Sequence, residues 1–469
     1  MKKVSQISAI VFLGVFFFLS MGNPVNAINY SSGFQVQNLS SSQVADLQIQ
    51  YYDKNGSVIT TFNTSPSDPD PKNQPVPASG SRTYYPIHAP SGFDGSVVIS
   101  SNTQVVAIVN TIANDGTASY FGSTTGFSSG ATSINLPLLM KGNAGFDTWF
   151  NVQNTGPAST IVTVTYSNGT QEQATIAPNA AATFTQSANA QLLPGFVGSA
   201  TVDGGGQPIV ASVMQVGTGD TKALLAYNSF SGGSQVIQAP LVVAKNSGFF
   251  SGIQVMNVGT VNTVVTITYS PNTAPGSSIG TPASDTCTLT PTGTTQSCTK
   301  LQLNGGVVTK WSDTYVGGAT ITSNPPQNLV AIVNQLTLAG QGSAYEGFNP
   351  TAAGTSVVAP LVMAKNSGFF TGIQVQNVGT ANCDSITVAY GPNTAGGFTP
   401  FNDVLLTPLT PGSSKTFLQL NGQWIDIYVG SATITATGGA GCKVASIVNE
   451  LALGTSGDQF LTYQALASN

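Results

Sequence analysis

Apolar and polar residues alternate with a period of two along most of the chain. In the stretch 263–269, for example, Val265, Ile267 and Tyr269 alternate with threonines. Such a period places successive side chains on opposite faces of a strand, and Thr, Val, Ile and Tyr favour strands. Gly, Pro, Asn and Ser interrupt the pattern at short intervals, as turns do. No window has the periodicity of an amphipathic helix, so the pattern predicts an all-β protein.

The pattern recurs in four copies, of which the clearest pair is 239–250 and 359–370, reading APLVVAKNSGFF and APLVMAKNSGFF. More distant copies of this stretch begin near 136 and 33. Three markers keep the same phase in every copy. They are an asparagine (Asn38, Asn154, Asn257, Asn377), an aromatic-x-Gly triplet (93–95, 196–198, 315–317, 428–430) and a late apolar strand (105–110, 209–214, 329–334, 444–449).

Each copy spans roughly 110 residues and holds several short predicted strands, which is typical of an antiparallel β-sandwich with Greek-key-like connections. The expected domains are 28–133, which is the most divergent, then 134–237, 238–357 and 358–469. Short joining segments rich in Gly, Ser, Thr and Ala (229–238 and 349–358) predict limited hinge freedom and a rod or gently bent arrangement.

The N-terminus has the features of a secretory signal peptide, expected over 1–27. Lys2 and Lys3 precede an apolar run at 10–19, and small residues at 25–27 suit cleavage before Ile28. The alternative is a membrane anchor, but the run is shorter than the roughly 20 residues that a span needs. We therefore expect a secreted or cell-surface protein with no transmembrane segment in the mature chain.

The chain carries few charges. Charged residues are 7% of it, against about 25% in an ordinary soluble protein. Its formal net charge is −5 and its basic residues are not clustered, so it offers no phosphate-binding surface for nucleic acids. A surface covered by Ser, Thr, Asn, Gln and Gly has little charge repulsion between copies, which favours self-association.

Four cysteines lie in the last two copies, and we expect them to form two disulfides. Cys287 and Cys298 are symmetric about residues 292–293, where a two-residue hairpin turn would place them opposite each other. Cys383 and Cys442 then remain to join an early strand of the fourth copy to a late one. Disulfides need an oxidising compartment, in agreement with export. The alternative of a metal site is disfavoured because there is no CxxC spacing and a single histidine.

The sequence offers no catalytic constellation, so we expect no enzyme activity, no cofactor and no metal. The single histidine, His88, has no counterpart in the other copies and is expected to be a polar loop residue. Asp68 and Asp70 flank a proline in a Pro-rich loop over 65–77. They favour a solvated loop over a calcium site, because further acidic ligands are missing nearby.

Lysines recur near the end of the first strand in three copies, at Lys141, Lys245 and Lys365. Asn334 and Asn449 end a later strand in two of those copies. An intramolecular Lys–Asn isopeptide bond is one interpretation. The other, which we favour, is an ordinary lysine at a strand end, its stem on apolar surface and its amine in water.

Aromatic residues recur at the end of each copy. They could stack on sugars, or they could close the core and pack against the next copy, which their position at the boundary favours. The residues are Tyr120, Phe121, Tyr227, Phe230, Tyr345, Phe348 and Tyr463.

Three motifs of the fourth copy carry a family resemblance: QVQNVGT at 374–380, ITVAY at 386–390 and LTPGSSKTF at 409–417. The chain resembles bacterial immunoglobulin-like and cell-adhesion-related (CARDB-like) surface domains in tandem. The resemblance implies four Ig-like sandwiches, extracellular display, and adhesion or spacing, and it brings no catalytic residues. We therefore expect a structural or adhesive surface protein that binds other surface or matrix macromolecules or copies of itself. An extracellular carbohydrate-binding protein that uses exposed aromatics is the alternative.

Overall fold

The computed structural model describes residues 9–15, 28–303, 310–452 and 457–467. Strands make up 57% of the structure. The described residues form no α-helix and only three single-turn 3-10 helices, at Pro71–Asn73, Gln186–Ala188 and Pro350–Ala352. The expectation of an all-β fold is confirmed.

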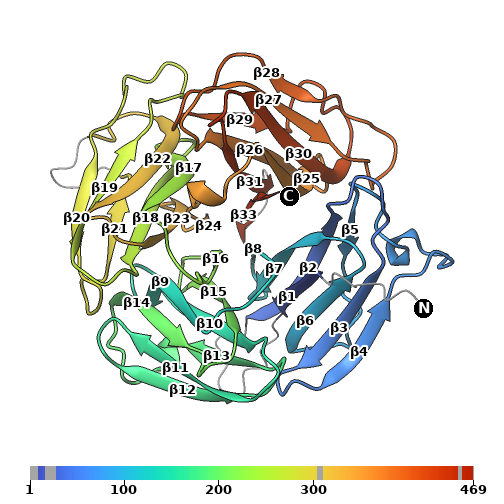
Figure 1. The fold of residues 1–469 in the computed structure, drawn as a ribbon, viewed down its shortest axis with the longest axis horizontal. Coiled ribbons are helices and arrows are strands. Elements are labelled where there is room, and N and C mark those ends of the chain that lie inside the picture. Colours follow the sequence, from blue (N-terminus) through green and yellow to red (C-terminus); the bar gives the residue numbers. More distant parts are fainter. Residues whose placement is uncertain (1–8, 16–27, 304–309, 453–456, 468–469) are drawn as a thin grey trace.

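The strands of the described residues form eight small sheets, which pair into four consecutive two-sheet units. Each unit has a hub sheet, whose last strand lies near the centre of the molecule, and a companion sheet packed against it (Figure 1). In the first unit the hub sheet has the order β5(Ser81–Tyr84), β2(Asn29–Asn38), β7(Val105–Asn114), β8(Ser119–Thr125), and the companion sheet has β1(Ala9–Val15), β6(Gly95–Ser101), β3(Leu47–Asp53), β4(Val58–Asn63).

The other three units repeat this order. The second has the hub sheet β13(Ala181–Thr185), β10(Phe146–Asn154), β15(Ile209–Gly217), β16(Leu224–Asn228) and the companion sheet β9(Ser133–Lys141), β14(Phe196–Asp203), β11(Thr160–Tyr166), β12(Gln171–Ile176). The third has the hub sheet β21(Ser297–Leu301), β18(Phe249–Asn257), β23(Leu329–Thr337), β24(Gly342–Glu346) and the companion sheet β17(Val236–Ala244), β22(Tyr315–Asn324), β19(Thr263–Tyr269), β20(Asp285–Leu289). The fourth has the hub sheet β29(Ser414–Leu418), β26(Phe369–Asn377), β31(Val444–Ala452), β33(Phe460–Gln464) and the companion sheet β34(Leu466–Ala467), β25(Ser356–Ala364), β30(Tyr428–Gly438), β27(Cys383–Tyr390), β28(Asp403–Leu405).

Each unit has its own hydrophobic core between its two sheets. In the third unit, Ile253 and Val255 of β18 face Val265 and Ile267 of β19, and all four side chains are fully buried. These are the alternate apolar positions of the sequence pattern, so the period of two predicts the core directly.

The aromatic-x-Gly marker has a steric cause. In β22 a Cβ atom at Gly317 would lie 2.3 Å from the hydroxyl oxygen of Tyr315, because that ring folds back over its glycine. Gly430 stands in the same relation to Tyr428, also at 2.3 Å. Any side chain at these glycines would displace a tyrosine that is fully buried in the core.

The four units form a closed ring, so the expectation of a rod is wrong (Figure 1). The hub strands meet in sequence, β8 against β16, β16 against β24, β24 against β33 and β33 against β8. The short strand β32(Gly457–Asp458) also pairs in parallel with β8 of the first unit. The physical reason lies in the hub sheets, since strands such as β15 are buried on both faces and need a neighbouring unit to cover the second face.

The described part of the apolar run near the N-terminus lies in strand β1, which pairs antiparallel with β6 from Ala9↔Ser101 to Val15↔Gly95. Lys2, Lys3 and the expected cleavage site at 25–27 lie outside the described residues. Within the described part of the chain, no helix has the length and hydrophobicity to cross a bilayer.

The disulfides join Cys287 to Cys298 and Cys383 to Cys442. The expected hairpin geometry of the first pair is wrong. β20 and β21 do not pair with each other, because β20 belongs to the companion sheet and β21 to the hub sheet. The Cys287–Cys298 bond therefore links the outer edges of two facing sheets.

Candidate functional site

The first and fourth units meet along a closing seam, formed by β2, β5 and β7 on one side and by β25, β26 and β31 on the other. Gln35 of β2 reaches across it and donates its side-chain amide to the carbonyl of Pro360 in β25. Phe121 of β8 packs against Phe369 of β26, with ring centroids 5.8 Å apart. Two cavities open along this seam, and they share Thr83.

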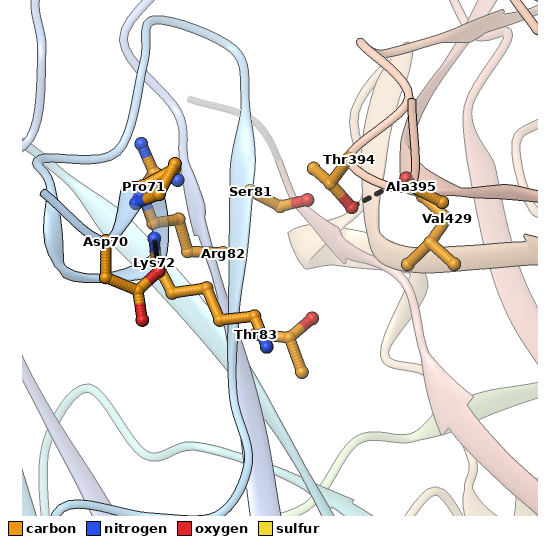
Figure 2. Close-up of a pocket in the computed structure, with 9 residues that line it drawn as sticks. All are labelled: Asp70, Pro71, Lys72, Ser81, Arg82, Thr83, Thr394, Ala395 and Val429. Atoms are coloured by element: carbon orange, nitrogen blue, oxygen red, sulfur yellow. Dashed lines mark hydrogen bonds between the residues drawn. The ribbon is translucent and has the colours of Figure 1, made fainter. Parts of the chain in front are cut away.

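The outer cavity has a volume of about 400 Å³. Figure 2 shows Ser81 of β5 and Thr394 of the fourth unit on opposite walls, and the Lys72 side chain extending toward Thr83. The Thr394 hydroxyl donates to the carbonyl of Val429, at 2.9 Å. Hydroxyls and one ammonium group suit a ligand that is rich in hydroxyls or carries negative charge. The full lining is Asp70, Pro71, Lys72, Ser81, Arg82, Thr83, Thr394, Ala395 and Val429.

Arg82 fixes the loop that forms one wall of the outer cavity. Its guanidinium donates from Nε to the carbonyl of Gln74 at 2.8 Å and from Nη2 to the carbonyl of Pro75 at 3.0 Å. Partial burial lowers the pKa of this guanidinium. Asp70 accepts from the backbone N–H of Lys72 at 2.9 Å and caps the 3-10 turn. The Pro-rich loop thus has a defined shape in which Lys72 faces the cavity.

The inner cavity has a volume of about 320 Å³ and mostly apolar walls. Phe121, Phe369, Leu361 and Leu461 are among its lining residues, and the carboxyl of Glu450 is its single acidic group. An apolar pocket with one buried titratable group is a typical small-molecule site.

Glu450 is 1% exposed. Its Oε2 accepts a hydrogen bond from the Asn110 amide at 3.2 Å, and its Oε1 has no partner among the described residues. Burial raises the pKa of this carboxyl to about 8, so the neutral acid predominates at pH 7.

Corresponding side chains also meet at two other seams of the ring, but there as amide pairs. Each amide pair exchanges two hydrogen bonds across its seam, and at the closing seam glutamate replaces glutamine. The pairs are Asn334 with Gln215 (2.7 and 3.0 Å), Asn449 with Gln335 (3.1 and 3.2 Å) and Asn110 with Glu450. The sequence pattern marked Asn334 and Asn449 but not their partners Gln215, Gln335 and Glu450, each of which directly follows the position of the recurring asparagine.

His88 lies in a loop and stacks on Phe62, with ring centroids 3.8 Å apart. Its Nε2 is 3.1 Å from the side-chain oxygen of Asn73, and burial lowers its pKa. Asp68 accepts from the backbone N–H of Asp70 at 2.8 Å, as in an Asx turn. Over the described ranges, no three His, Cys, Asp or Glu side chains come together as a metal site would require.

The three lysines near strand ends donate to backbone carbonyls of nearby loops. Lys141 donates to Asn189 at 2.7 Å, Lys245 to Ser312 at 2.8 Å and Lys365 to Ile425 at 2.9 Å. Asn334 and Asn449 use their amides across the seams instead, which leaves the isopeptide interpretation without support.

Four of the aromatics at the ends of the copies are buried tyrosines, including Tyr120, which is 1% exposed. The other three, Tyr227, Tyr345 and Tyr463, are at most 2% exposed, and each donates to a carbonyl of the first strand of its unit. They cannot stack on a sugar in the folded protein. Phe121 differs from them, because it lines the inner cavity.

No family model and no curated protein matches the chain. Among solved structures, a glycoside hydrolase of family 32 from Bifidobacterium adolescentis aligns over 97% of this chain and 95% of its own. The sequence identity is 10% and the TM-score is 0.14. A similarity at this level carries no argument about fold or function.

Proposed function

We propose that the protein is an exported structural or adhesive protein of the cell surface, built from four Ig-like copies and acting by binding and assembly rather than by catalysis. The observation that carries the proposal is the closed ring. It joins four copies into one body and leaves eight outer sheet edges facing away from the hub, on β4, β5, β12, β13, β20, β21, β28 and β29. Exposed edge strands bind further strands through main-chain hydrogen bonds.

Two features support assembly through these edges. The edge strands carry exposed apolar residues, such as Val58 and Ile59 on β4 and Val404 on β28, which are 45–50% exposed. The low charge of the chain reduces the repulsion that would keep copies apart. Lys310 and Asp285 form an ion pair with each other inside the third unit, at 2.8 Å.

Fractionation of the exporting cells tests the proposal. We expect the exported chain to remain with the cell surface in assemblies larger than one copy. Val404→Lys and Val58→Lys should shift it toward the monomer, whereas Thr170→Lys in a turn should not. A monomer that is free in the medium would overturn the assembly proposal.

The outer cavity favours a second candidate, an extracellular carbohydrate-binding protein. Its hydroxyls and Lys72 offer donors and acceptors of the kind that bind sugars. A glycan screen should then find a ligand whose binding is lost in Lys72→Ala and kept in Lys54→Ala. A screen that stays blank with the folded protein would exclude this candidate.

A further inference from the structure

The first strand of a unit also packs against the next unit in the ring. β9 pairs with β14 of its own unit and contacts β18 and β23 of the third unit. β17 lies in the same way against β26 and β31, and β25 against β2 and β7. In the first unit the corresponding place is beside β6, and β1 occupies it. β6 borders the second unit, because its Val98 packs with Val210 of β15.

Two kinds of hydrogen bond anchor the first strand in the last three units. A buried tyrosine bonds both the N–H and the C=O of one leucine in the strand. A glutamine of the next unit donates to the carbonyl of the preceding proline. The tyrosine–leucine pairs are Tyr227 with Leu138, Tyr345 with Leu241 and Tyr463 with Leu361, and the glutamine–proline pairs are Gln254 with Pro137, Gln374 with Pro240 and Gln35 with Pro360.

The first unit lacks the tyrosine anchor. Tyr227 lies opposite Val213 in the register of its hub sheet, and in the first unit the residue opposite Val109 is Thr124. The first unit therefore has a threonine, Thr124, where the other units have the tyrosine that fixes the first strand.

The facing side of the second unit is also different. Asn151 of β10 stands where the other units have glutamine, and it pairs in register with Ser212, where they have isoleucine. The Asn151 Oδ1 and both polar atoms of Gln153 have no partner among the described residues, although these side chains are only 6% and 4% exposed. Buried amides without partners are costly, and they point to a missing polar ligand.

At this place β1 forms a backbone ladder with β6. Its register puts Val11, Leu13 and Val15 opposite Ile99, Val97 and Gly95. In the second unit, Ile134, Leu136 and Leu139 hold the corresponding positions, opposite Val202, Ala200 and Gly198. The place thus accepts an extended strand with apolar residues at alternate positions. β1 itself belongs to the segment that we expect to be removed on export.

We propose that the mature chain binds, at this place, an extended polypeptide strand supplied by another molecule. The strand pairs antiparallel with β6, its alternate apolar residues cover Val97 and Ile99, and its backbone bonds the amides of Asn151 and Gln153. Side-chain amides both donate and accept, so they match any peptide backbone, while the buried valine and isoleucine select apolar residues. This inference rests on the proposed export, because it needs the leader to be removed.

The test uses the exported protein, after its intact mass has shown that it begins at Ile28. A labelled peptide with the sequence of residues 9–15, flanked by lysines for solubility, should bind with one-to-one stoichiometry in fluorescence anisotropy. It should also slow amide hydrogen exchange in Gly95–Ser101. The same peptide with Phe12→Pro, which removes a backbone N–H from the ladder, should bind at least tenfold more weakly.

A protein variant separates binding from folding. Gln153→Met should weaken the peptide several-fold without lowering the melting temperature, since it removes unpaired buried amide atoms. The matched variant Gln376→Met, at the corresponding position of the fourth unit, should leave peptide binding unchanged. Absence of peptide binding, or an exported protein that retains residues 9–15, would overturn the inference. Fractionation as a free monomer would instead overturn the assembly proposal and leave peptide binding intact.

Discussion

Asn110 and Glu450 lie on opposite sides of the closing seam, and the asparagine amide donates to the carboxyl at 3.2 Å. At the neighbouring seam, Asn449 and Gln335 exchange two hydrogen bonds instead. An ionised glutamate can only accept hydrogen bonds, whereas a protonated one can also donate one. The ring therefore closes through a group whose hydrogen bonding changes with pH.

We expect the pH dependence of stability to reflect this carboxyl. Its pKa is raised from 4.5 to about 8 by burial, so between these values the folded state holds a proton that the unfolded state has lost. The contribution of this carboxyl to the free energy of unfolding is therefore complete below about pH 4.5, and it decreases as the pH rises toward 8. Urea denaturation of Glu450→Gln should show a flatter dependence than the wild type over this range. At pH 7 the variant should be more stable by about 1 kcal/mol, because the glutamine can form the reciprocal pair.

The neighbouring seam supplies the matched control. Gln335→Glu places a carboxyl at the corresponding position and should introduce a new loss of stability as the pH rises. If Glu450→Gln kept the full pH dependence, the residual slope would belong to other buried acids such as Glu346 and Asp458, whose pKa values are also raised by burial.

The tyrosine anchor predicts a specific loss of stability. Tyr345→Phe keeps the buried ring but leaves the N–H and C=O of Leu241 without their hydroxyl partner, which lies at 3.2 and 2.6 Å. We expect a loss of about 1–3 kcal/mol in the free energy of unfolding. Tyr85→Phe, at a tyrosine that is 54% exposed, should change it by less than about 0.5 kcal/mol. Equal effects of the two variants would contradict the anchor.

The two disulfides should stabilise the protein to different degrees. They join residues 11 and 59 positions apart. On the chain-entropy model the shorter loop contributes about 3 kcal/mol and the longer about 4 kcal/mol. Paired Cys→Ser variants, compared by urea denaturation, should show a larger loss for Cys383 and Cys442. The reverse order would indicate that the link between the sheet edges at Cys287 and Cys298 matters more than loop length.

Ring closure should depend on Ile108, which is 1% exposed and packs into the core of the fourth unit. Ile108→Ser copies the residue that the second unit has at this position, Ser212. We expect it to weaken the closing seam by about 2–4 kcal/mol. Small-angle scattering should then show a larger radius of gyration in mild urea than for the wild type. Ser32→Ala, within the first unit, should leave the radius unchanged.

The all-β class and the alternating core could be predicted from sequence, because each strand carries its own period of two. Ring closure could not be predicted in the same way, since it depends on a second buried face of the hub strands. β15 carries the only kind of sequence evidence for such a second buried face. Its sequence IVASVMQVG is mostly apolar, and all nine of its residues are buried. Such a run indicates cover on both faces but not which segment provides it.

The candidate site was harder to predict because its parts come from distant positions. Thr83 and Thr394 approach each other only after four units have closed. Glu450 looks like an ordinary strand glutamate until the ring places Asn110 beside it. The hairpin expected around Cys287 and Cys298 failed for a related reason. Spacing along the chain gives the distance between two strands but does not say whether they belong to the same sheet.

The parallel pairing of Gly457–Asp458 with Ser119–Tyr120 has a consequence for synthesis and export. The two halves of this contact are separated by most of the chain, so the ring of an emerging polypeptide stays open until the fourth unit has been made. During that interval the first unit presents an uncovered seam that matches the fourth unit of a neighbouring chain whose ring has not yet closed. A contact that closes on itself within one molecule makes a ring, and the same contact made between molecules propagates a filament. The order in which the chain emerges therefore decides between a closed particle and an open polymer.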